Sequence, residues 1–388
     1  MVDDKQMTVA WHVDDLKISH VSDKVVDDFI ADLDSEFGKE TPLSKSRGKV
    51  HDYLGMTLDF SVPGQVTITM IDYIKMICMD LPKCMIGTAA TPAANHLFRV
   101  DDENAAPLDK DTADLFVHLT MQLLFLSQRA RPDIRTAISF LCGRIQHPND
   151  HDYKKLARVM KYLQSTIDLP LVLSADGTGV PRWHIDASYA VHADMKSHTG
   201  GAMTLGKGSV YSTSVKQKLM TRSSTEAEVV AVHDVMPQML WTAYFLKGQG
   251  VHVPDSILYQ DNMSAMLLEK NRRASASKRS RHMNIRYFFI ADRAKNGELR
   301  IEYCPTAEMI GDFFTKPLQG AQFHILRDDI MNIDPRSVYH SAHRSVLSPE
   351  SRHDDDRPHY DDDDVTSTDA SEEDDVSMRK SYLEALLQ

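Results

Sequence analysis

Four acidic residues in the second half of the chain occupy places where their side chains could do chemistry together. Asp186 lies inside the apolar stretch RWHIDASYA, and Asp261 directly follows the apolar stretch SILYQ. Glu228 lies in the first turn of a predicted helix, and Asp312 lies early in the last predicted helix. Each of the last three could simply cap a helix or complement its dipole. An acid within a strand, however, needs either solvent or a partner.

Carboxylates held at strand ends and helix starts can converge on one edge of a sheet. Four such groups repel one another unless a cation lies between them, and hard oxygen ligands favour Mg²⁺ or Mn²⁺. Two such ions about 3.5–4 Å apart can clamp the attacking and leaving oxygens of a phosphodiester. The sequence therefore predicts a site with two ions, in which Asp186, Glu228, Asp261 and Asp312 are both the metal ligands and the catalytic residues.

Two basic stretches flank these acids and favour a polyanionic partner. Nine Lys and Arg residues lie between 270 and 295 against one acid, and five lie between 195 and 222 with none. The predicted nucleic-acid-binding residues are Lys216, Lys218, Arg222, Arg272, Arg273, Lys278, Arg279, Arg281 and His282.

The net charge of −12 is unevenly distributed. Residues 341–388 hold 14 acids and 5 bases, which leaves only −3 for the first 340 residues and does not exclude a nucleic-acid partner. The four cysteines form no C-x-x-C pair, the N-terminus lacks the pattern of a secretory signal, and no run of about 18 apolar residues occurs. We therefore expect an intracellular protein of the cytoplasm or nucleus, neither secreted nor inserted in a membrane.

The elements that must position these residues follow from hydrophobic periodicity. In the first half we expect two hairpins, the second turning at Pro63-Gly64, each followed by a helix, then a linker over 86–107 and helices over 111–166. In the second half, three strands (PRWHIDASYAVHA, GGAMTLGKGSVYSTSV and KLMTRSS) precede helices that alternate with the strands SILYQ and LRIEYC. The last helix is expected from Thr306. This pattern predicts a mixed α+β or α/β sheet with flanking helices.

Several of these motifs, in this order, resemble the C-terminal part of copia-type retrotransposon Pol polyproteins. SSTEAE, DNMSA, RHMNIRYFFI and GDFFTKPL resemble ribonuclease H signatures, and RPDIRTAISF resembles the start of the connecting helices of that family. HVDD and YLGMTLDF resemble the hairpins of the reverse-transcriptase palm. The resemblance implies three parts: a partial palm (1–85), a linker with a helical thumb or connection (86–180) and a ribonuclease H-like domain (181–328). It has no counterpart for the acidic tail (329–388), which we expect from its composition to be disordered.

The same resemblance implies a function. The four acids would cleave the RNA strand of RNA–DNA hybrids, which are recognised by shape and 2′-hydroxyls. Asp14 and Asp15 would be a metal-binding pair left from the polymerase, which we expect to be inactive because a third aspartate and a fingers domain would lie upstream. Gly311 stands where the family often has alanine and is expected to loosen the last helix by roughly 0.5–1 kcal/mol.

Two other interpretations remain. An integrase or transposase orders its acids Asp, Asp, Glu, whereas this chain has Asp, Glu, Asp, Asp with gaps of 42, 33 and 51 residues. That order disfavours an integrase. The stronger alternative is a catalytically dead retroelement remnant that acts at most as a nucleic-acid-binding or interaction module.

Overall fold

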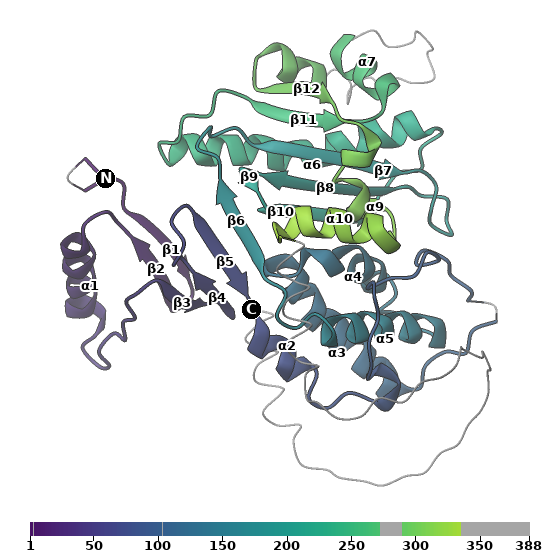
Figure 1. Ribbon diagram of the computed structural model, residues 1–388, viewed down its shortest axis with the longest axis horizontal. Coiled ribbons are helices and arrows are strands. Elements are labelled where there is room, and N and C mark those ends of the chain that lie inside the picture. Colours follow the sequence, from purple (N-terminus) through teal and green to yellow (C-terminus); the bar gives the residue numbers. More distant parts are fainter. Residues whose placement is uncertain (3, 103, 272–288, 335–388) are drawn as a thin grey trace, which may run out of the picture. The chain divides into compact units, whose positions relative to one another are not determined.

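The N-terminal part is a separate hairpin followed by a helix, as predicted. The computed structural model describes residues 1–2, 4–102, 104–271 and 289–334 (Figure 1). Strands β1 (Thr8–His12) and β2 (Asp15–Ser19) pair antiparallel, and α1 (Asp23–Phe37) follows. The tight turn places Val13 at φ 50°, a left-handed conformation that is costly for a β-branched residue. The turn thus lifts the Asp14 and Asp15 side chains into solvent, where both are exposed.

A second sheet connects segments that are far apart in the sequence. Its strand order is β3-β4-β5-β6-β9. The strands are β3 (Val50–Tyr53), β4 (Met56–Asp59), β5 (Gln65–Thr69), β6 (Leu171–Ala175) and β9 (Gly206–Lys207). The predicted turn joins β4 to β5, with Gly64 at φ 77°, where a side chain would be strained. Because this sheet takes strands from either side of residues 85 and 180, the division into domains stays a prediction.

Helices fill most of residues 71–164. They are α2 (Ile71–Ile77), η1 (Lys83–Met85), α3 (Lys110–Arg129), η2 (Pro132–Ile134), α4 (Arg135–Cys142) and α5 (Asp150–Gln164). The starts of α3 and α5 follow from their sequences, because the Asp109 side chain accepts from the Thr112 amide and Asn149 forms a capping box with Asp152. The helical expectation for 111–166 is confirmed, apart from the breaks between these helices.

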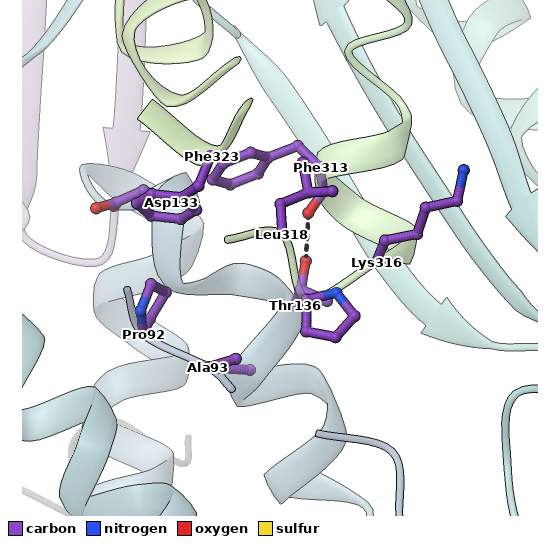
Figure 2. Close-up of a pocket in the computed structure, with 10 residues that line it drawn as sticks. Pro92, Ala93, Asp133, Thr136, Phe313, Lys316, Leu318 and Phe323 are labelled. Carbon is purple, nitrogen blue, oxygen red and sulfur yellow. Dashed lines mark hydrogen bonds between the residues drawn. The ribbon is translucent and has the colours of Figure 1, made fainter. Parts of the chain in front are cut away.

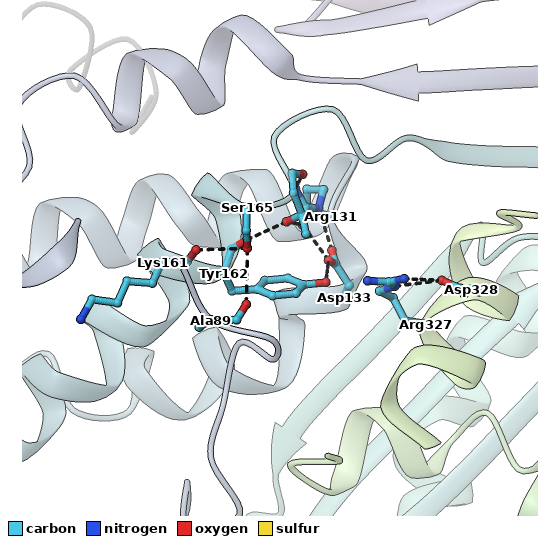
Figure 3. A network of polar contacts seen from close by, with 9 residues as sticks. Ala89, Arg131, Asp133, Lys161, Tyr162, Ser165, Arg327 and Asp328 are labelled. Carbon is cyan, nitrogen blue, oxygen red and sulfur yellow. Dashed lines mark hydrogen bonds and ion pairs between the residues drawn. The ribbon is translucent and has the colours of Figure 1, made fainter. Parts of the chain in front are cut away.

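A buried ion pair fixes the joint between α3 and α4. Arg131 donates two hydrogen bonds to the Asp133 carboxylate, at 2.9 and 2.8 Å, and a third to the Thr166 carbonyl at 2.7 Å. The Tyr162 hydroxyl donates to the same carboxylate at 2.7 Å (Figure 3). Every charged atom of the pair therefore has a partner, as a buried ion pair requires.

The third sheet is the predicted mixed sheet. Its order is β10-β8-β7-β11-β12, in which β10, β8 and β7 are antiparallel and β11 and β12 run parallel to β7. The strands are β7 (Arg182–Ser188), β8 (His198–Thr204), β10 (Tyr211–Lys216), β11 (Ser256–Gln260) and β12 (Leu299–Tyr303). Helix α6 (Ser224–Gly248) contacts β7 and β8, α7 (Met263–Asn271) follows β11, and residues 289–295 are helical. The predicted mixed sheet with flanking helices is confirmed.

Two expectations about elements were wrong. KLMTRSS is not a strand. Just before it, the buried side-chain amide of Gln217 donates to the Thr199 hydroxyl and to the Ala227 carbonyl, and these hydrogen bonds direct the chain toward α6. The last helix is not continuous from Thr306 but consists of η4 (Thr306–Glu308), α9 (Asp312–Thr315) and α10 (Gly320–Met331). Pro317 explains the break after α9, since a residue before proline favours extended backbone, and Lys316 has φ −129° and ψ 139°.

Two hydrophobic cores lie in these parts. The sheet core is formed by β7, β11, β12 and α6, and includes Trp183, Val229 and Leu258. The helical core is formed by α2 to α5 and also takes in Phe313 of α9 and Phe323 of α10. The apolar side chains of α9 and α10 therefore belong to the helical core, although α9 also lies against β7 and β8. No helix among the described residues has the length and apolar character needed to cross a membrane.

Candidate active site

Asp186 is the central acid of the candidate site. It lies in β7, pairs across to Gly200 of β8, and is 2% exposed. The Thr315 hydroxyl donates to its Oδ2 atom. The partner that a buried acid in a strand requires is thus a hydroxyl from α9, together with a nearby ammonium described below.

Asp261 and Asp312 reach the same place from other elements. Strands β7 and β11 are parallel, so the residues at their C-terminal ends meet at one edge of the sheet. Asp261 follows β11 directly, and Asp312 begins α9, which contacts β7 and β8. One carboxylate oxygen from each of Asp186, Asp261 and Asp312 lies within 4.8 Å of the others. The tertiary structure therefore gathers three of the four predicted acids.

Glu228 lies beside this group without joining it. The Ser223 side chain caps α6, so Glu228 lies in the second turn of this helix and not in the first turn as predicted, and it is 4% exposed. The Ala187 amide hydrogen-bonds the Glu228 carboxylate, whereas the Oε2 atom has no hydrogen-bond partner among the described residues. Burial raises the pKa of Glu228 well above its usual value, and the charges of Asp186 and Asp261 raise it further.

Lys316 balances part of the negative charge. Its ammonium lies 2.5 Å from Asp312 Oδ1 and 3.7 Å from Asp186 Oδ2. Burial, and then the charge of Asp186, still raises the pKa of Asp312 to about 7. Sequence reasoning missed Lys316 and Thr315. Their signal was the spacing of four and three residues from Asp312, which places side chains on one face of a helix.

Two glycines allow α9 to lie close to the sheet. A Cβ atom at Gly200 would lie 2.6 Å from the Thr315 Cγ2 atom and 2.7 Å from the Phe314 carbonyl carbon. A Cβ atom at Gly311 would lie 2.9 Å from the Asp186 Cβ atom and 3.0 Å from its amide nitrogen. The expectation that Gly311 merely loosens a helix was wrong, because the residue precedes α9 and its missing side chain makes room for β7.

The remaining predicted residues are not members of this cluster or lie outside the described residues. Lys216 ends β10, whereas Lys218 and Arg222 lie between β10 and α6, and all three are exposed. Lys216 pairs with Asp194 at 2.8 Å. Asp14 and Asp15 are in no cluster of three possible metal ligands among the described residues. The other predicted nucleic-acid-binding residues lie outside the described residues, as does the tail from 335 on: Arg272, Arg273, Lys278, Arg279, Arg281 and His282.

The amino-acid sequence is similar to those of retroelement Pol polyproteins. The chain is 32% identical over 197 residues to the retrovirus-related Pol polyprotein from transposon RE2 of Arabidopsis thaliana, which covers 50% of this chain. It is 27% identical over 207 residues, 53% of this chain, to the corresponding polyprotein from transposon TNT 1-94 of Nicotiana tabacum. The chain spans only 13% and 15% of these relatives. No protein-family model matches.

Among solved structures, that of LC11-RNase H1, isolated from compost by a metagenomic approach, aligns with this chain. The alignment covers 40% of this chain and 97% of the LC11-RNase H1 chain. The identity is 10% and the TM-score is 0.28.

Proposed function

We propose that this chain, which belongs to the copia-type retrotransposon Pol family, is a divalent-metal-dependent ribonuclease H that hydrolyses the RNA strand of RNA–DNA hybrids. The observation that carries the proposal is the convergence of Asp186, Asp261 and Asp312 within 4.8 Å at one edge of a ribonuclease H-like sheet. So many acids in one buried place are costly unless a cation is shared between them.

The donor set fits hard divalent cations. All the candidate ligands are carboxylates, which suit Mg²⁺ or Mn²⁺, and no histidine or cysteine belongs to the three-residue group. The unpartnered Oε2 atom of Glu228 is a fourth donor beside the cluster. When bound, two such ions would supply an activated water and stabilise the leaving oxygen of the phosphodiester.

The side chains around the acids each have a defined task in this proposal. Asp186 and Asp312 would hold a metal ion from β7 and α9, and the Thr315 hydroxyl donates to the Asp186 carboxylate and so fixes its orientation. Lys316 neutralises part of their charge in the metal-free protein. Protons on Glu228 and Asp312 must leave before these groups can act as ligands, because both pKa values are raised.

The substrate would approach along the exposed basic residues near the start of α6. Lys218 and Arg222 are exposed there, in a stretch from 195 to 222 that holds five basic residues and no acid. Such residues contact phosphates and bind nucleic acids without reading their sequence. A hybrid would then be selected by its shape and its 2′-hydroxyls.

The test is cleavage of an RNA–DNA hybrid labelled on the RNA strand, with Mg²⁺ or with chelator. Wild type should cleave only with the metal, and Asp186→Asn should lower the rate by at least about a hundredfold, as expected when a group that acts on the transition state is lost. Asp14→Asn makes the same charge change at an exposed residue and should keep the wild-type rate. Binding of the hybrid without any cleavage by wild type would favour the catalytically dead module instead.

A further inference from the structure

Helix α9 is too short to hold its own position. It spans four residues, Asp312–Thr315, and a single helical turn in isolation is unfavourable. The last carbonyl groups of a helix also find no hydrogen-bond donor within the helix, so donors from other elements must bind them. Since α9 carries Asp312 and Thr315, whatever holds this turn also sets the geometry of the acidic cluster.

Two hydroxyl groups from other elements hold the α9 carbonyls. The Thr136 hydroxyl of α4 donates to the Phe313 carbonyl at 2.9 Å, across 177 residues of sequence. The Ser214 hydroxyl of β10 donates to the Phe314 carbonyl at 2.8 Å, and His198 hydrogen-bonds the same hydroxyl. The contact with Thr136 lies beside a cavity of about 20 Å³, next to Lys316 (Figure 2).

The two holding elements are themselves connected. The Ser139 hydroxyl, one turn after Thr136 on α4, donates to the Ser214 carbonyl of β10. Phe313 and Phe314 belong to the helical core with α3, α4 and α5, and not to the sheet core. Helix α4 therefore donates a hydrogen bond to α9 and also packs apolar side chains against it, and α9 carries Asp312.

We propose that α4 is part of the nuclease site, with Thr136 as a positioning residue that sets the place of Asp312 through the Phe313 carbonyl. This inference rests on the proposed function. A one-turn helix anchored at its carbonyl end cannot shift without moving Asp312 relative to Asp186 and Asp261. Groups that orient metal ligands without touching the metal commonly change metal affinity by about 10- to 100-fold when they are removed.

The full-length chain offers a matched set of variants. Thr136→Val keeps the shape and removes the hydroxyl, whereas Thr136→Ser keeps the hydroxyl. Thr120→Val is the control, because Thr120 is fully buried on α3 in the same helical core and its hydroxyl has no hydrogen-bond partner among the described residues. All three variants change a buried threonine, but only the first removes the contact with α9.

Two measurements are made on each variant: amide hydrogen exchange of residues 309–318 without metal, and Mg²⁺ binding by calorimetry. We expect Thr136→Val to speed exchange in this segment and to raise the Mg²⁺ dissociation constant about tenfold, while Thr136→Ser and Thr120→Val stay near wild type. A merely structural role would lower the stability of Thr136→Val without this selective change in metal binding.

Two results would overturn the inference: wild-type exchange and Mg²⁺ binding in Thr136→Val, or equal changes in Thr136→Val and Thr120→Val. Failure of the proposed function is a separate result. If wild type neither binds Mg²⁺ nor cleaves a hybrid, the nuclease proposal fails, and the exchange comparison still decides whether Thr136 holds α9.

Discussion

Neutralising Asp186 should stabilise the metal-free protein at alkaline pH. Two unit charges at 4.8 Å, the upper limit of the separations in the acidic cluster, repel by about 3.5 kcal/mol at an effective dielectric constant of about 20. Asp186 has two such neighbours, Asp261 and Asp312. Against this repulsion stands its attraction to the Lys316 ammonium at 3.7 Å, about 4.5 kcal/mol on the same scale. Because Asp261 is partly exposed and therefore screened, the net gain from Asp186→Asn should be about 1–3 kcal/mol.

The pH dependence of this gain follows from Asp312. Its folded pKa of about 7 lies above the ordinary value of 3.8, so the folded protein binds more protons than the unfolded chain between these pH values. Ionisation of Asp312 therefore lowers the stability of the wild type as the pH rises from about 4 to 7, and the penalty is fully present above that. At pH 5.5 Asp312 is protonated and one repulsion is absent. The attraction to Lys316 then outweighs the remaining repulsion, so the gain from Asp186→Asn should turn into a loss of about 1 kcal/mol.

The assay is thermal unfolding in chelator at pH 8 and pH 5.5, with Asp14→Asn as the control for an equal charge change. At pH 8 the midpoint of Asp186→Asn should rise by on the order of 5 °C. Excess Mg²⁺ should reverse the order, because only wild type then gains binding energy, about 2.7 kcal/mol at a hundred times the dissociation constant. A lower midpoint than wild type at pH 8 in chelator, or an equal gain at both pH values, would refute the reasoning.

Three further predictions follow from the same site. Gly311→Ala should destabilise the protein by about 1–3 kcal/mol in urea unfolding, because the new Cβ atom would lie 2.9 Å from the Asp186 Cβ atom. Gly248 has open space around it, so Gly248→Ala should leave the stability unchanged. Equal effects of the two substitutions would contradict the close approach of Gly311 to β7. Lys316→Met should lower the midpoint of thermal unfolding in chelator at pH 8, because the ammonium that offsets the charge of Asp312 is lost. The same change should tighten Mg²⁺ binding several-fold in calorimetry, because a cation that competes with Mg²⁺ is removed. Weaker Mg²⁺ binding would contradict this competition. Mg²⁺ affinity of the wild type should rise by about fivefold between pH 6 and 7 and by about twofold above, because Asp312 must lose its proton. An affinity independent of pH would contradict the raised pKa.

The sequence determined much of the local structure and the identity of the acids. Alternation and turn residues such as Pro63-Gly64 are local signals, so the hairpins and the mixed sheet were predictable from them. The positions of Asp186 and Asp261 within and after strands were also readable, because they depend only on neighbouring residues. The prediction of a continuous helix from Thr306 was wrong at Pro317, the seventh residue of GDFFTKPL, because the residue before a proline favours extended backbone and α9 ends at Thr315.

Only the tertiary structure decided how these pieces meet. The parallel pairing of β7 with β11 brings Asp186 and Asp261 to one edge, and the α4 hydroxyl of Thr136 holds the turn that carries Asp312. Lys316 gained its place in the cluster only because α9 lies against the sheet at two glycines. The physical reason is that a sequence pattern reports the period of one element, whereas distances between elements depend on packing and pairing among residues that are far apart in the chain.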